Sequence, residues 1–192
     1  MSKFLTVKQL KKIGFKKIGK NCKISKSITA YNLTGSLGDN VRIDDDVQLK
    51  GKIEIKSRAH IARGCTLSAG KSGIFMGELT SLANYVQIYS SSDDYYYPSL
   101  PVATLNEKMR KKFSKVYKKK IIIGKCCLVG TFCVLLPGAN LGDFSSVAAL
   151  TIVNKKINKG IFLTQSKSKE LKKKRYLKLF EKKYLDYKKL NK

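Results

Sequence analysis

The chain has 192 residues and carries 40 lysine and arginine residues against 13 acidic ones, a formal net charge of +27. Hydrophobic residues make up 43% of the sequence, which is enough for one folded domain with its own core. No apolar run reaches the length of a membrane span, and residues 1–15 lack the apolar stretch of a signal peptide. We therefore expect a cytoplasmic protein.

The first predicted element is a short helix, within a cap that we expect over residues 1–17. Thr6 is a typical helix N-cap and Gly14 a typical stop. Val7, Leu10 and Ile13 fall on one helical face. We expect this helix to close one end of the repeat that follows, because an uncovered end would expose the repeat's core.

Between residues 18 and 160 hydrophobic residues recur every six positions. The two longest unbroken runs are Leu37, Ile43, Leu49, Ile55, Ile61, Leu67 and Ile123, Val129, Leu135, Leu141, Val147, Val153. A helix would need apolar residues three and four positions apart, so this spacing indicates short strands joined by corners. Such strands bury their apolar side only when they are stacked. The sequence therefore predicts an all-β solenoid.

Four of the five cysteines share one position of the repeat. They follow the hydrophobic anchor by four residues: Cys22, Cys65, Cys127 and Cys133. We expect these thiols to face inward and to pack as small hydrophobes, whereas Cys126 should face outward. There is no Cys-x-x-Cys spacing, so we expect no metal site.

The period stops between about residues 90 and 120. This stretch is typical of an excursion loop, with a short helical piece around residues 107–113, and a loop of this length in a repeat protein is usually functional. Residues 108–120 contain eight basic residues and no acid. The period returns at Ile123.

From residue 161 to residue 192 apolar residues alternate with lysines, which predicts a basic C-terminal α-helix. This helix either packs on the solenoid or another subunit, or makes peripheral contact with the inner face of the membrane. The charge also raises nucleic acid as a partner, but neither basic stretch carries a nucleic-acid-binding signature. Nucleic acid is therefore not the partner we expect.

The chain has one histidine, His60, and histidine is the side chain best suited to take a proton near neutral pH. By the period, His60 ends the unit that begins at Ile55, which places it at a corner outside the core. A solvent-exposed corner histidine without a catalytic role is the alternative. Asp93 and Asp94 begin the excursion, where they either orient a base and bind an acceptor or form a solvated loop start. The family resemblance given below places them on another corner than His60, and it thus implies that they meet His60 only across a subunit boundary.

The repeat resembles that of the hexapeptide-repeat acyltransferases. Within that family, the branch that acetylates sugars for surface polysaccharides is similar in the stretches Leu37-Gly-Asp-Asn-Val-Arg-Ile-Asp-Asp, Ala59-His-Ile-Ala and Val86-Gln-Ile-Tyr-Ser-Ser-Ser-Asp-Asp-Tyr. The resemblance covers residues 18–160. It implies a left-handed parallel β-helix with three hexapeptides per coil, assembled as a homotrimer with sites between subunits.

The resemblance also assigns roles. It implies that His60 is catalytic and that acetyl-CoA is the co-substrate. The residues it implies for acceptor binding are Asp93, Asp94, Asn84 and Tyr95. Coenzyme A would lie along the C-terminal coils, where small residues leave backbone amides reachable: Gly130, Thr131, Ala148 and Ala149. Small residues demanded by the corners of the fold are the alternative for these four.

We therefore expect an acetyl-CoA-dependent O-acetyltransferase of a sugar in a surface polysaccharide or its precursor, with direct transfer and His60 as general base. Two alternatives are open. The first is an N-acetyltransferase of a nucleotide-linked amino sugar. The second is a catalytically degenerate β-helix that binds or scaffolds, which is favoured by the absence of a Gly-x-Pro-Ala-Lys-like segment after the last coil.

Overall fold

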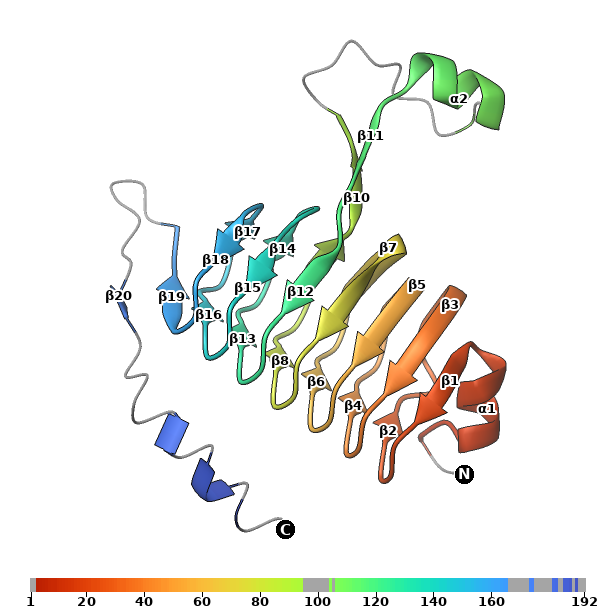
Figure 1. Ribbon diagram of the computed structural model, residues 1–192. Coiled ribbons are helices and arrows are strands. Elements are labelled where there is room, and N and C mark those ends of the chain that lie inside the picture. Colours follow the sequence, from red (N-terminus) through yellow and green to blue (C-terminus); the bar gives the residue numbers. More distant parts are fainter. Residues whose placement is uncertain are drawn as a thin grey trace.

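The computed structural model of the chain describes residues 3–94, 104, 106–165, 173–174, 181–182, 185–187 and 189. Figure 1 shows one coil wound from the N-terminal helix toward the C-terminal segment, with successive turns stacked side by side. Three walls of parallel strands enclose the core, and we name each wall after one of its strands. The predicted β-solenoid is confirmed.

The strands fall into three walls. The β1 face holds β1 (Phe15–Ile18), β12 (Ile121–Ile123), β15 (Asn140–Leu141), β18 (Lys156–Ile157) and the second halves of the long strands β3 (Thr29–Leu37), β5 (Gln48–Ile55) and β7 (Thr66–Met76). The β2 face holds β2 (Lys23–Ile24), β4 (Arg42–Ile43), β6 (His60–Ile61), β8 (Ser81–Leu82), β13 (Leu128–Val129), β16 (Ser146–Val147) and β19 (Ile161–Leu163). The β9 face holds the first halves of the long strands, with β9 (Gln87–Tyr89), β14 (Val134–Leu135) and β17 (Ile152–Val153).

The six-residue period corresponds to the inward positions of these walls. Each hydrophobic residue of the two long runs is at most 3% exposed. On the β2 face the parallel pairing aligns one buried hydrophobic residue from every coil: Ile24, Ile43, Ile61, Leu82, Val129, Val147 and Leu163. Burying these stacked side chains is the main favourable term in the stability of the fold.

The N-terminal helix is also confirmed, as α1 (Val7–Lys12). The Thr6 hydroxyl accepts a hydrogen bond from the Gln9 backbone, and the Gln9 side chain accepts one from the Thr6 backbone at 2.8 Å. These two bonds form a capping box. Leu10 is 1% exposed and belongs to the core, so the helix closes the first coil.

The glycines after the anchors are required by close contact between coils. A Cβ atom on Gly38 would lie 2.4 Å from the backbone nitrogen of Ser57 in the next coil, and one on Gly124 would lie 2.5 Å from the side chain of Asp143. The chain therefore turns from the β1 face to the β2 face at a corner that leaves no space for a side chain.

The inward cysteines have a role beyond packing. Cys65, Cys127 and Cys133 are at most 2% exposed, and Cys22 is half-buried against the same core. Each thiol donates to a corner carbonyl of the next coil, of Gly38, Ala83, Gly142 and Ala148, at 3.1, 3.1, 3.3 and 2.9 Å respectively. The thiols thus satisfy carbonyl oxygens at the corners.

The excursion is a projecting arm. Strand β10 (Ser91–Asp93) pairs antiparallel with β11 (Val116–Lys118), and α2 (Glu107–Phe113) precedes β11. The arm lies between β9 and β12 in the chain, and Figure 1 shows β10, β11 and α2 extending away from the coil. The predicted excursion is confirmed, together with its helical piece.

The expected boundary of the C-terminal region is wrong. The coil continues through β19, where Leu163 is 4% exposed, because Ile161 and Leu163 still supply apolar side chains to the core. Strand β20 (Lys173–Lys174) then pairs antiparallel with β19, where a helix was expected. Most of the rest of the predicted helix lies outside the described residues, although residues 181–182, 185–187 and 189 are helical. No helix among the described residues is long and apolar enough to span a membrane.

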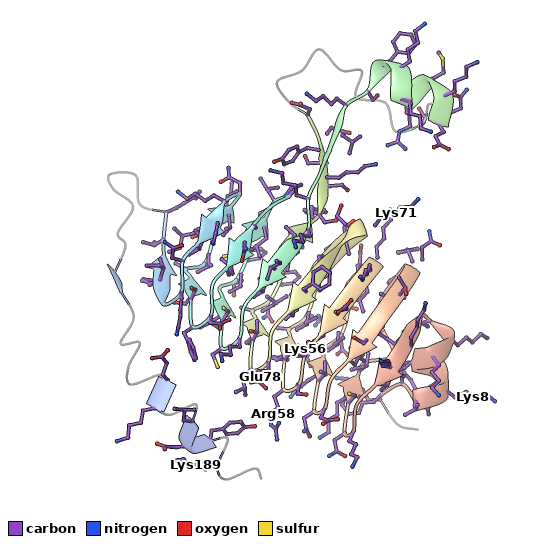
Figure 2. The ribbon with its side chains drawn as sticks, in the orientation of Figure 1. Lys8, Lys56, Arg58, Lys71, Glu78 and Lys189 are labelled. Atoms are coloured by element: carbon purple, nitrogen blue, oxygen red, sulfur yellow. The ribbon has the colours of Figure 1, made fainter. Side chains whose placement is uncertain are left out.

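The described C-terminal residues contact one corner of the coil. The Arg58 guanidinium lies 5.3 Å from the centre of the Tyr187 ring, and Lys159 forms an ion pair with Glu181. Figure 2 shows Lys56, Arg58 and Glu78 at this corner, on the side of the coil where Lys189 lies. These described residues of the C-terminal region therefore lie against the solenoid.

The buried cysteines give a test of the fold. Burial raises the pKa of the Cys65 thiol to about 11, so this thiol stays neutral and unreactive at pH 8. We expect N-ethylmaleimide to modify Cys126 in the native protein, and Cys65, Cys127 and Cys133 only after unfolding in urea. Peptide mapping by mass spectrometry measures this order. Equal rates for Cys65 and Cys126 in the native protein would contradict the structure.

Candidate active site

His60 is the first residue of β6 and projects outward from the β2 face. Its neighbours Ala59 and Ile61 point into the core and are at most 1% exposed, so the imidazole between them faces solvent with 38% of its side chain exposed. The predicted corner position is wrong. The corner ends before His60, with Arg58 in the left-handed region at φ 58°, because the chain needs Ala59 to re-enter the core.

An aspartate from the preceding coil holds His60. The Asp44 carboxylate lies 2.8 Å from His60 Nε2, and its other oxygen accepts from Arg42 Nε at 2.7 Å. Burial acts to raise the pKa of Asp44, but hydrogen bonds and charge from His60 and Arg42 outweigh it and hold this pKa below its usual value. Asp44 is therefore ionised at neutral pH, and it loses its charge only as the pH falls through that lowered pKa.

This pairing decides which imidazole nitrogen can act as a base. A carboxylate only accepts hydrogen bonds, so His60 Nε2 must donate and Nδ1 carries the lone pair in the neutral ring. Nδ1 lies 3.5 Å from the Ser81 hydroxyl, on the next strand of the β2 face. The basic nitrogen therefore faces the later coils of the solenoid.

Asp44 was not among the residues singled out from the sequence, which assigned the orienting carboxylate to Asp93 or Asp94. The sequence does mark Asp44 as unusual. It directly follows the anchor Ile43, a position often held by glycine or alanine in other units. Two residues earlier, Arg42 pairs with His60 across adjacent strands. The contact spans 16 residues and depends on that register.

The residues predicted to bind coenzyme A share the corner between the β2 and β9 faces. Gly130, Thr131, Ala148 and Ala149 lie there in successive coils, and Asn84 occupies the same corner one coil earlier, where its carbonyl accepts from Phe132. We expected the backbone amides of these residues to be free to bind coenzyme A, and this is wrong for two of them. The amides of Gly130 and Ala148 donate to the carbonyls of Val147 and Leu163. A Cβ atom on Gly130 would also lie 2.5 Å from the nitrogen of Ala149, which supports the structural role.

The same corner carries a column of exposed apolar side chains. Tyr85, Phe132 and Leu150 follow one another in adjacent coils, with 42%, 53% and 71% of their surface exposed. All three have positive φ, at 59°, 57° and 59°, and the first two rings stack at 5.2 Å. Leu128 on the β2 face and Ile152 on the β9 face flank the column, each 49% exposed. We call these five residues the apolar column.

The predicted acceptor residues do not all meet. Asp93 is the last residue of β10, two positions farther out along the arm than Ser91, and it is exposed. The Asp94 carboxylate lies 3.4 Å from Lys115, and its backbone nitrogen donates to the Lys115 carbonyl at 3.1 Å. The arm leaves the coil after the β9 face, whereas His60 lies on the β2 face. Tyr95 lies outside the described residues.

Known proteins match this architecture. No family model matches the chain. It is 32% identical over 151 residues to the dTDP-4-amino-4,6-dideoxy-D-glucose acyltransferase of Escherichia coli, across 76% of this chain and 75% of that protein. The chain belongs to the hexapeptide-repeat, left-handed β-helix acyltransferases. It is an acyltransferase.

Solved structures agree with this assignment. AntD, an N-acyltransferase from Bacillus cereus in complex with dTDP and 3-hydroxybutyryl-CoA, superposes with a TM-score of 0.85 and 29% identity over 100% of both chains. A variant of AntD with dTDP-4-amino-4,6-dideoxyglucose and coenzyme A has a TM-score of 0.83 and 30% identity, over 97% of this chain and 99% of that one. A maltose O-acetyltransferase from Clostridium difficile 630, at 19% identity and a TM-score of 0.53, shares the fold.

The pair of His60 and Asp44 gives a mutational test. We expect Asp44→Asn to lower kcat for acyl transfer at least about tenfold with little change in KM, because an amide does not stabilise the imidazolium and can favour the wrong tautomer. The matched control is Asp46→Asn, which removes a carboxylate 2.7 Å from Arg63 at the neighbouring corner. Steady-state kinetics of coenzyme A release measures both. Equal kcat values for the two variants would rule out a role for Asp44.

Proposed function

We propose that this acyltransferase transfers the acyl group of an acyl-CoA to the amino group of a nucleotide-linked amino sugar. The observation that carries the proposal is the match to AntD over the whole chain, because AntD is an N-acyltransferase with structures that hold a dTDP-linked amino sugar and coenzyme A. The Escherichia coli relative is named for the same sugar nucleotide. These similarities favour N-acylation over O-acetylation of a polysaccharide sugar, which was our first expectation from the sequence.

The geometry of His60 suits such a transfer. A neutral amine attacks the thioester carbonyl, the carbon–sulfur bond breaks, and the nitrogen must lose a proton as the amide forms. In this proposal His60 Nδ1 accepts that proton and returns it to the departing coenzyme A thiolate. Asp44, 2.8 Å from Nε2, stabilises the imidazolium between the two steps.

A homotrimer would complete the site. The apolar column exposes five large apolar side chains close together, and a partner subunit packed there would bury them. A second copy packed there would bring its arm toward the first copy's β2 face. Asp93 and Asp94 could then accept hydrogen bonds from the amino group of the acceptor opposite His60, which they do not approach within one chain.

The proposed reaction is tested with purified substrates. We expect a mass gain of one acyl group on dTDP-4-amino-4,6-dideoxyglucose when the protein is incubated with acetyl-CoA or 3-hydroxybutyryl-CoA, and none on the corresponding 4-hydroxy sugar nucleotide. Liquid chromatography with mass spectrometry measures both products. Acylation of the hydroxy sugar alone would contradict N-acylation and indicate an O-acyltransferase instead. If neither sugar nucleotide gains mass and coenzyme A does not bind at millimolar concentration, the binding or scaffold alternative is favoured.

The oligomer is tested at the apolar column. We expect Phe132→Asp to shift the protein from trimer to monomer, because a carboxylate at the centre of the interface would be buried without a partner. Sedimentation velocity measures the mass. The control is Met109→Asp on α2, a side chain of similar exposure at 41%. A trimer that persists in Phe132→Asp would place the interface elsewhere.

A further inference from the structure

The arm carries a surface that the reaction described so far does not use. Figure 1 shows α2 at the outer end of the arm, beyond β10 and β11. Every residue from Asn106 to Phe113 is exposed, so α2 contributes nothing to the core. The other basic helix, α1, differs because its Leu10 is 1% exposed and joins the core. The apolar side chains of α2 are therefore available to an external partner.

Two large apolar side chains stand on one side of α2. Met109 and Phe113 are four residues apart, which is about one helical turn, and they are 41% and 38% exposed. The side that faces β11 is polar instead, because Glu107, Lys111 and Ser114 line the groove between α2 and β11. Glu107 is the one acid of α2, and it pairs there with Lys111 at 2.9 Å. The apolar pair thus points away from β11 and from the acid.

Basic side chains flank this apolar pair. By the helical period, Lys108 and Lys112 lie on one side of it and Arg110 lies on the other. The Lys112 ammonium lies 5.2 Å from the centre of the Phe113 ring. Residues 106–120 together hold eight basic residues and one acid. Helix α2 is therefore a short amphipathic helix with an apolar centre and cationic margins.

An anionic membrane surface matches both parts of this arrangement. Its headgroups attract lysine and arginine, and large apolar side chains enter the boundary between the headgroups and the acyl chains. Long basic side chains reach from that boundary back to the headgroups. We propose that Lys108, Met109, Arg110, Lys112 and Phe113, which we call the α2 surface, dock the enzyme on a membrane that contains anionic lipid.

Two other partners fit the α2 surface less well. A second copy of the chain carries the same net charge of +27, so electrostatic repulsion would oppose its approach. A nucleic-acid duplex supplies phosphates, but it offers no apolar layer to Met109 and Phe113. A membrane supplies both. Docking on it does not depend on which sugar is acylated, so this inference goes beyond the proposed function.

Vesicle binding by the full chain tests the α2 surface. We expect the protein to co-sediment with vesicles of phosphatidylcholine and phosphatidylglycerol, and not with vesicles of phosphatidylcholine alone. Phe113→Ala should weaken binding about tenfold, because most of one inserted aromatic side chain is lost. Arg110→Ala should weaken it about fivefold, the effect of one cation near an anionic surface. The controls are Val7→Ala and Lys11→Ala on α1, which should bind like the unmodified protein.

A fluorescence measurement locates the contact. The chain contains no tryptophan, so a single introduced tryptophan reports its own surroundings. We expect the emission of Phe113→Trp to shift to shorter wavelength with the anionic vesicles and to be quenched by brominated lipid. Phe75→Trp on the β1 face is the control and should show neither change. Unchanged emission of Phe113→Trp in protein that co-sediments would place the contact elsewhere, such as the C-terminal region, and would overturn the proposal.

The remaining outcomes separate this inference from its alternatives. Equal vesicle binding by Phe113→Ala and the unmodified protein would overturn it. Binding to a DNA duplex that Arg110→Ala weakens, without vesicle binding, would make α2 a nucleic-acid contact. A smaller mass of Phe113→Ala in sedimentation velocity would make α2 a subunit contact.

The proposed function is tested separately from the α2 surface. We expect acyl transfer in solution to be the same in every variant, because α2 carries none of the residues assigned to the reaction. Failure of the vesicle test would therefore leave N-acylation intact. Vesicle binding that depends on Phe113, without any acyl transfer, would support the α2 surface and overturn the proposed function.

Discussion

The parallel register between successive coils is the constraint on which the rest of this structure depends. Each strand donates and accepts backbone hydrogen bonds with the strand one coil away, and the aligned anchors from Ile24 to Leu163 form one continuous core. The coils approach so closely that Gly38 and Gly124 have no space for a Cβ atom. Because backbone pairing fixes every outward side chain, distant residues become neighbours at set intervals.

That constraint assembles the site from residues that look unrelated in sequence. Arg42, His60 and Ser81 form one outward row, and Asp44 reaches His60 diagonally from the preceding corner. The carboxylate fixes the tautomer, so the base faces the later coils. Neither the position of His60 nor its tautomer requires a loop to close or a segment to become ordered. His60 lies on a strand that is paired on both sides, and Asp44 directly follows strand β4.

Two faces of the coil border the apolar column. The β2 face carries His60 and Leu128, and the β9 face carries Ile152. If copies meet at the column, as we propose, the β2 face of one copy stands opposite the β9 face of the next.

The sequence by itself determined the solenoid, its N-terminal helix, the excursion and the inward cysteines, because a six-residue period leaves few alternatives for burying apolar side chains. It also identified His60, the one histidine of the chain, as the candidate base. Only the tertiary structure decided that His60 stands on a strand, that Asp44 and not Asp93 orients it, and that the amides of Gly130 and Ala148 are already bonded. Those facts depend on contacts between coils, and a periodic pattern along one chain does not specify which diagonal neighbours touch.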